Sequence, residues 1–590
     1  MWAIMVSKMH VCFLYVYDYL VLKNIGFTFD DRFVFRTEGN VLHISMNGTA
    51  LPKNFWGRGI YSLSAIVGNN GSGKTTALRL MKKLFVDGEP RDAGVDVAIV
   101  YEQQGTLFVY NPLGFQIVCQ DGIGYKEVHD RRRIETLYYS GHFQPYTGAE
   151  GEMELSGSYD ASDAWLLIKD LLDYSNVDTY HLTEPIYNHL NAYYAQNNYR
   201  ICETLLLEGL DTLLPTFRLP RYVMLAPNMG GFNAIKLEGR KREKNWDLPG
   251  EKYSSKDIRG KALERFIYYD IVNLIAENKG RPDVMTGLLS SWLNAPKSKD
   301  VVAAFKEWLN TYRIEDSEKK PLEAVAYVVA QMNDLCDFDN NSGTFFIDIR
   351  KDAEHLRTLV DDVLRVRYFL TARFFDIYYG HSVVGYQRMS SGELEMLNLL
   401  SRLYYGITLL PQKIDNKESP RLLLLDEAEI GFHPEWQRQY VKILTEFMGY
   451  MMVKAGADFQ IVITSHSPII LSDMPVCCVN FLRREGDVTR VVTDETQTFG
   501  ENVFNLYRRA FFMENGLIGE FAQQKIRQWA KQVEENFFSD ELLKSINLIG
   551  DERIKDYLMR EIAAGDIDAE IAYYEKKIKE LREAKENRNE

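Results

Sequence analysis

Three glycines, a lysine and two threonines are gathered in the stretch GNNGSGKTT. Glycines at this spacing let backbone N–H groups curl around phosphate oxygens, and the start of a following helix favours negative charge. A lysine adds a cation for the phosphates, and a threonine hydroxyl is a ligand for Mg²⁺. The stretch therefore predicts a phosphate-binding loop made of Gly68, Asn69, Asn70, Gly71, Ser72, Gly73, Lys74, Thr75 and Thr76.

The residues on either side of this loop supply the elements that must position it. Residues 61–67 (YSLSAIV) have the composition of a strand, and ALRLMKKLF, which follows Thr76, has the pattern of an amphipathic helix. Strand, glycine-rich loop and helix form the context that confirms a G-x-x-x-x-G-K-[ST] motif. We expect Lys74 to bridge the β- and γ-phosphates of ATP and Thr75 to ligate Mg²⁺.

A pair of acids ends a second buried run, in RLLLLDEAEIGFHPEWQ from Arg421 to Gln437. The leucines predict a strand buried on both faces, and two acids at its end are costly unless they meet a cation. We therefore interpret Asp426 as the Mg²⁺-side carboxylate and Glu427 as the general base that polarises water.

A histidine follows a third apolar run, in FQIVITSHSPIIL from Phe459 to Leu471. His466 lies where the predicted strand meets a Ser-His-Ser-Pro turn, a place from which an imidazole can contact a γ-phosphate. The order along the chain favours a γ-phosphate sensor over a structural histidine.

The segment MSSGE, residues 389–393, opens an amphipathic helix far from the phosphate loop. Ser390 and Glu393 fit a capping box, which is the structural alternative for this segment. The segment also resembles the signature motif of ABC-type ATPases, commonly Leu-Ser-Gly-Gly-Gln. In that family the signature contacts the nucleotide of a second subunit, so the resemblance adds Ser390, Ser391, Gly392 and Glu393 to the ATP site.

The residues after Glu427, AEIGFHPEWQ, lack the Ser-x-Leu-Asp segment of transporters and resemble the SMC/RecF/OLD group of ABC-type ATPases. That family implies a glutamine that completes the Mg²⁺ coordination. Gln144 is our candidate, and Gln103 and Gln104 are alternatives.

The composition of the chain limits which classes of protein it can belong to. The net charge of −14 disfavours indiscriminate wrapping of nucleic acid, although Arg131–Arg133 and the basic run at Arg240, Lys241, Arg242 and Lys244 stay candidate contacts. Six scattered cysteines form no metal-ligand spacing, so we expect a reduced, cytoplasmic protein without a zinc site. The apolar run 11–22 is too short to span a bilayer and is interpreted as one buried strand.

We predict an α/β fold, in which an ABC-type P-loop ATPase head is assembled from the N- and C-terminal parts of the chain. The expected domains are the N-terminal head part (1–150), a mostly helical insertion (151–370), the C-terminal head part (371–497) and a helical C-terminal region (498–590). Helical periodicity in 187–213, 261–278, 301–312 and 322–335 supports the insertion. No heptad is sustained, so long coiled-coil arms are not expected.

The tail TFGENVFNLYRRAFFMENGLIGEFAQQKI, residues 498–526, resembles the ATPases of the Septu anti-phage system (PtuA-like proteins, including retron-associated forms). The resemblance implies a head homodimer or higher oligomer that controls a separate HNH-type nuclease, with DNA or a retron-type nucleic acid as a further partner and no membrane. No nuclease motif is found in this chain. The alternative is a RecF/SMC-like repair or recombination ATPase that acts directly on DNA.

Overall fold

The computed structural model describes residues 9–85, 95–132, 134–142, 158–163, 165–167, 170, 185–229, 255–277, 282–295, 299–364, 375–384, 387–409, 421–486, 488–492, 497–509, 518–535, 537, 539–564, 571, 575 and 578. Two compact units are formed by Met1–Leu506 and by Tyr507–Glu590, and each is described by itself.

The largest sheet of the first unit joins strands from both ends of the chain. Its order is β11-β10-β17-β18-β5-β19-β20-β2-β1-β6-β7-β9. The six strands from β11 to β19 are all parallel to one another. They comprise β11 (Ser158–Asp160), β10 (Thr136–Ser140), β17 (Arg421–Asp426), β18 (Phe459–Ser465), β5 (Ile60–Gly68) and β19 (Val479–Glu485). The head is therefore assembled from N- and C-terminal parts, as the predicted fold class requires.

The remaining strands of this sheet are mostly antiparallel, and they pack against a small second sheet of order β3-β4-β8. Apolar side chains from both sheets, such as Phe13, Leu42 and Val100, form one buried cluster between them. The bounds are β1 His10–Tyr19, β2 Leu22–Thr28, β3 Phe33–Glu38, β4 Val41–Met46, β6 Asp96–Gln103, β7 Thr106–Tyr110, β8 Gln116–Cys119, β9 Tyr125–Val128 and β20 Val488–Val492.

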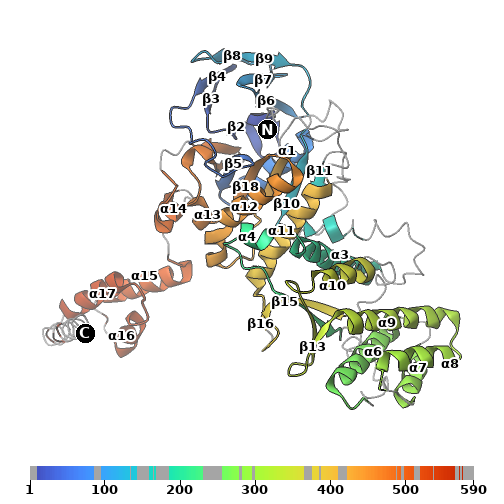
Figure 1. The fold of residues 1–590 in the computed structure, drawn as a ribbon. Coiled ribbons are helices and arrows are strands. Elements are labelled where there is room, and N and C mark those ends of the chain that lie inside the picture. The colour runs from blue at the N-terminus through green and yellow to red at the C-terminus, as the bar shows by residue number, and fades with distance from the viewer. Residues whose placement is uncertain are drawn as a thin grey trace. The chain divides into compact units, whose positions relative to one another are not determined.

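Helices cover the parallel strands. Helix α1 (Lys74–Phe85) buries Leu78, Met81 and Phe85 in a cluster with side chains of β17 and β18. Further helices of the head are α11 (Ser391–Leu409), α12 (Pro434–Ala455), α13 (Pro468–Leu471) and the 3₁₀ turn Val476–Cys478. The division between the two units falls within α14 (Val503–Arg509). Helix α11 contacts β10, and helix α12 contacts β5 (Figure 1). All six residues of β17 are buried, as expected for a parallel strand covered on both faces.

The insertion is built from helices around a five-stranded sheet of order β13-β14-β12-β15-β16 (Figure 1). The helices are α3 (Pro185–Leu205), α4 (Leu210–Leu213), α6 (Ile258–Glu277), α7 (Pro282–Asn294), α8 (Val301–Thr311), α9 (Asp316–Leu335), α10 (Ala353–Thr358) and a π-helix (Leu359–Leu364). The strands are β12 (Tyr222–Pro227), β13 (Asp337–Asp339), β14 (Thr344–Asp348), β15 (Phe375–Ser382) and β16 (Gln387–Arg388). Strand β15, which the sequence assigned to the head, pairs along its length with β12.

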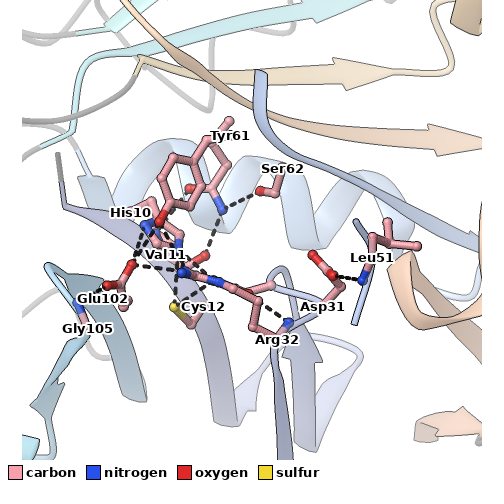
Figure 2. Close-up of polar contacts among 12 residues, drawn as sticks. His10, Val11, Cys12, Asp31, Arg32, Leu51, Tyr61, Ser62, Glu102 and Gly105 are labelled. Atoms are coloured by element: carbon pink, nitrogen blue, oxygen red, sulfur yellow. Dashed lines mark hydrogen bonds and ion pairs between the residues drawn. The ribbon is translucent and has the colours of Figure 1, made fainter. Parts of the chain in front are cut away.

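A buried network of charged side chains ties β1 and β6 to the start of β5 (Figure 2). His10 Nε2 lies 2.6 Å from Asp30 Oδ2, and the Arg32 guanidinium donates to Asp30 Oδ2 at 2.7 Å and to Glu102 Oε2 at 2.9 Å. Tyr61 donates to the same Glu102 oxygen at 2.8 Å. Cys12, His10 and Asp30 are close enough together to share a metal ion, but the Arg32 guanidinium already supplies a cation to the carboxylate there. We therefore interpret the network as an ion-paired link between strands.

The second unit is helical where it is described. Helices α15 (Glu520–Glu534), α16 (Asp540–Ile546) and α17 (Glu552–Ala564) enclose an apolar cluster that includes Val533, Ile546 and Leu558. Among the described residues, no helix is both long and apolar enough to cross a membrane.

Two predictions about elements need correction. The run 11–22 is not one strand, because β1 ends at Tyr19 and the chain turns at Leu20, whose φ is +52°, before β2 begins at Leu22. The predicted helix 187–213 is interrupted between Leu205 and Leu210, where Gly209 takes a φ of +75°.

Candidate active site

The phosphate loop lies between β5 and α1, where the sequence predicted it. The Lys74 side chain is 4% exposed, and its ammonium donates back to the carbonyl oxygens of Gly68 (3.2 Å) and Asn69 (3.3 Å). Burial lowers the pKa of Lys74, and the nearby carboxylates of Glu427 and Asp426 oppose that shift. The Ser72 hydroxyl is buried without a hydrogen-bond partner among the described residues. Such an orphaned donor, beside a buried cation, fits a site for an anionic group.

Gly68 is required because another strand passes close to it. A Cβ atom at this position would lie 2.2 Å from the carbonyl oxygen of Leu482 on β19. Any larger residue would push β19 away from β5, so the loop keeps its place only with glycine here.

Asp426 gathers three hydroxyl groups at the end of β17. Its Oδ1 accepts from Thr75 at 3.2 Å and from Thr464 at 2.6 Å, and its Oδ2 accepts from Tyr138 at 3.0 Å. A carboxylate and a threonine hydroxyl thus lie together beside the phosphate loop. Because Mg²⁺ takes hard oxygen ligands, Asp426 and Thr75 fit the metal that the sequence predicted.

Glu427 follows with a strained backbone, since its φ of +47° lies in the left-handed region that non-glycine residues rarely adopt. Its N–H donates to the Thr464 hydroxyl at 3.0 Å. His466 Nε2 lies 3.1 Å from Oε1, Lys74 Nζ lies 4.0 Å from the same oxygen, and His142 Nε2 lies 2.7 Å from Oε2. Burial alone would raise the pKa of Glu427, but the two imidazoles and Lys74 outweigh it and lower the pKa to about 2.

Four residues predicted from three separate motifs, Lys74, Asp426, Glu427 and His466, are therefore in one site, together with Thr75. His142 was missed. It follows the buried strand β10, which lies directly beside β17, and the segment SGHFQPY that contains it was considered only for its glutamine. A polar side chain immediately after a buried strand was the signal that could have found it.

The candidate glutamines fall in two parts of the chain. Gln144 lies outside the described residues. Gln103 and Gln104 are at the turn between β6 and β7, next to Glu102 and the network of Figure 2. In this region the Val11 N–H of β1 donates to the side chain of Gln460, which lies at the start of β18. Asp426 pairs with Thr464 near the other end of β18, so Gln103 and Gln104 lie at the opposite end of the strands from Asp426.

The signature segment forms a reciprocal capping box. The N–H of Ser390 donates to Glu393 Oε2 at 2.7 Å, and the N–H of Glu393 donates to Ser390 Oγ at 3.3 Å. His381 Nε2 also approaches Glu393, at 3.4 Å from Oε1. The capping alternative is thus realised, and it leaves the exposed residues Ser390 and Ser391 at the start of α11 as a surface that can meet an anion, whereas Gly392 is buried beside Trp436.

A second glutamate lies behind the site. Glu429 is buried and accepts a hydrogen bond from the hydroxyl of Ser465, the residue before His466. Burial raises the pKa of Glu429 to about 7. The group is neutral over part of the physiological range, and it joins the segment after β17 to the segment that carries His466.

Comparison with known proteins supports the chemistry of this site. Residues 337–472 match the family described as "AAA domain, putative AbiEii toxin, Type IV TA system". The match includes the signature segment, the acid pair and His466. The C-terminal part of the site therefore lies in a segment that is similar to an AAA domain.

Two curated relatives match parts of the chain. Protein ea59 of Escherichia phage lambda is 26% identical over 142 residues, which are 24% of this chain and 24% of that protein. The Retron Vc95 probable ATPase of Vibrio cholerae serotype O1 biovar El Tor is 20% identical over 192 residues, which are 32% of this chain and 35% of that protein. The chain thus spans about a quarter to a third of the length of these relatives.

Two solved structures of the recombination mediator protein RecF, with ATPrS and with ATP, are 12% and 11% identical to this chain. They cover 82% and 78% of this chain and 94% of their own chains, with TM-scores of 0.21 and 0.20.

Proposed function

We propose that this chain is the ATP-hydrolysing subunit of a bacterial anti-phage defence system of the Septu type. The observation that carries the ATPase chemistry is the place of Glu427, within reach of His466 and Lys74 and next to Asp426, which is bonded to Thr75. A buried acid, a buried cation and a hydroxyl–carboxylate pair at one loop suit phosphoryl transfer to water.

In this mechanism the backbone N–H groups of the loop and the Lys74 ammonium bind the phosphates of ATP. Asp426 and Thr75, with Gln144 as the proposed third ligand, would hold Mg²⁺, which would supply positive charge to neutralise the phosphates. Glu427 orients a water and accepts its proton while the water oxygen bonds to the γ-phosphorus and the bond to the β–γ bridging oxygen breaks. Before this step His466 contacts the γ-phosphate of the bound ATP and so senses it.

The signature segment would complete the site across a head dimer. The start of α11, with Ser390 and Glu393 held in their capping box, would face the nucleotide bound to a partner's phosphate loop. Closing and opening of the two heads would then control a separate HNH-type nuclease.

The defence role is supported by the similarity to the Retron Vc95 probable ATPase, whereas the name of the phage lambda protein ea59 gives no role. Both similarities cover part of each chain, so the partner and the trigger belong to the proposal. The basic run at Arg240, Lys241, Arg242 and Lys244, a candidate for contact with nucleic acid, lies outside the described residues.

The ATPase proposal is tested with Glu427→Gln and Lys74→Ala. We expect Glu427→Gln to bind ATP while its hydrolysis rate falls by about 10²-fold or more, because a general base is lost. We expect Lys74→Ala to lose nucleotide affinity. Undiminished hydrolysis by Glu427→Gln would remove Glu427 from its role.

The biological role is tested by mass spectrometry of proteins that co-purify with the tagged chain from its host, with and without nuclease treatment. A small HNH-type protein retained after digestion supports the defence proposal. Repair proteins and DNA that are lost on digestion support the alternative, a RecF/SMC-like ATPase that acts on DNA directly.

A further inference from the structure

The two carboxylate oxygens of Glu427 have different surroundings. Oε1 faces the phosphate loop and the segment after β18, with His466 Nε2 at 3.1 Å and Lys74 Nζ at 4.0 Å. Oε2 faces the end of β10, with His142 Nε2 at 2.7 Å. Only Oε1 is therefore directed toward the groups that would surround the γ-phosphate.

The backbone at the end of β10 places His142 beside Glu427. Ser140 pairs with Asp426 in the parallel register of β10 and β17, and the Gly141 N–H donates to the Asp426 carbonyl at 3.0 Å. A Cβ atom at Gly141 would lie 2.3 Å from the Glu427 carbonyl oxygen, so the approach of the two chains requires glycine. The next residue must then lie beside Glu427.

Core packing does not explain the imidazole at this position, because the His142 side chain is 41% exposed. A short contact with a largely buried carboxylate, made by a side chain that contributes little to the core, points to a role exercised through that carboxylate.

We propose that His142 is a positioning residue for ATP hydrolysis: it holds Oε2 of Glu427 so that Oε1 is presented to the attacking water. This inference rests on the proposed function. The single Nε2–H of His466 cannot be donated to Glu427 Oε1 and to a γ-phosphate at the same time. When His466 turns from Glu427 to the γ-phosphate, the contact with His142 keeps the Glu427 carboxylate in its orientation.

The expected effect is on the chemical step rather than on binding. A carboxylate free to rotate is a misplaced base, and misplacement by about 1 Å can cost about 10²-fold in rate. We expect His142→Ala to lower kcat by about 10- to 100-fold and to leave the dissociation constant for ATP within about twofold of wild type. His142→Gln should retain most of the rate, because its amide nitrogen reaches about as far as Nε2 and can donate the same bond.

The experiment compares wild type, His142→Ala, His142→Gln, Glu427→Gln and the double variant Glu427→Gln/His142→Ala in steady-state hydrolysis. ATP binding is measured separately in EDTA, where no turnover occurs. His43→Ala, on β4 of the small sheet, is the matched control for loss of a partly exposed histidine. Non-additivity is decisive: the double variant should be no slower than Glu427→Gln, because His142 acts through the carboxylate.

The outcomes separate the inference from the function on which it rests. If wild type hydrolyses ATP, Glu427→Gln does not, and His142→Ala matches wild type, the inference on His142 is overturned and the ATPase assignment stands. Equal losses in His142→Ala and His142→Gln, or a large loss of ATP affinity in both, would also overturn it. If wild type neither binds nor hydrolyses ATP, the proposed function itself fails.

Discussion

Glu429 gives the protein a pH-dependent stability that one substitution should remove. Burial raises its pKa to about 7, against an ordinary value of 4.5, although Ser465 donates a hydrogen bond to it. Between these two values the folded state binds more protons at this group than the unfolded state does. The contribution of Glu429 is therefore fully present below about pH 4.5 and is lost as the pH rises through 7.

The size of this loss in stability follows from the difference between the folded and unfolded pKa values of Glu429. With a folded pKa near 7 and an unfolded pKa near 4.5, the contribution falls by about 2 kcal/mol between pH 5.5 and pH 8. Glu429→Gln keeps an acceptor for the Ser465 hydroxyl but carries no charge at any pH. The variant should therefore gain about 2 kcal/mol relative to wild type over that interval, on top of a constant offset of about 1 kcal/mol from the altered hydrogen bonds.

The assay is urea unfolding of nucleotide-free wild type and variant at pH 5.5 and pH 8, and the quantity compared is the difference between the two proteins at each pH. Glu435→Gln is the control, because Glu435 is exposed and its pKa is about 2, so it stays ionised throughout. A Glu429→Gln difference that does not change between the two pH values would refute the reasoning.

Three further substitutions test other parts of the site and fold. Thr464→Val removes the hydroxyl that donates to Asp426 and accepts from the Glu427 N–H. The free energy of unfolding should therefore fall by about 1–3 kcal/mol, and kcat should fall by a larger factor than ATP affinity. Equal losses in kcat and in ATP affinity would contradict this prediction. Gly141→Ala places a Cβ against the Glu427 carbonyl, and hydrolysis should be lost while circular dichroism shows the fold retained; an active variant would show that the close approach is dispensable. Arg32→Ala leaves the carboxylates of Asp30 and Glu102 without their cation, so unfolding measurements should show that the free energy of unfolding falls by about 2–3 kcal/mol. This loss is smaller than for a fully buried pair because Arg32 is partly exposed. An unchanged stability would mean that the network of Figure 2 does not hold the strands together.

The sequence predicted those elements that are marked by consecutive residues of the chain. Strands β5, β17 and β18 were predicted because each is a short apolar run that ends in polar residues with recognisable chemistry. The turn at Leu20 was missed because neither glycine nor proline marks it, and a leucine at positive φ is not expected.

The contact of His142 with Glu427 could not be predicted in the same way. It depends on β10 being the neighbour of β17, and sheet order is not visible in residues that are far apart along the chain. The left-handed conformation of Glu427 likewise depends on Thr464 of the adjacent strand, which binds its N–H.

The place of β5 between β18 and β19 also constrains how the protein is made. Strand β5 ends at Gly68, whereas β18 begins at Phe459 and β19 at Val479. At about 5–20 residues per second, a ribosome needs about 20 s or longer to produce either neighbour after the phosphate-loop strand has left it. During that time an apolar strand has both edges open, and pairings so distant in sequence form slowly. The nascent N-terminal strands of this chain are therefore open to wrong pairings until β18 and β19 have been translated.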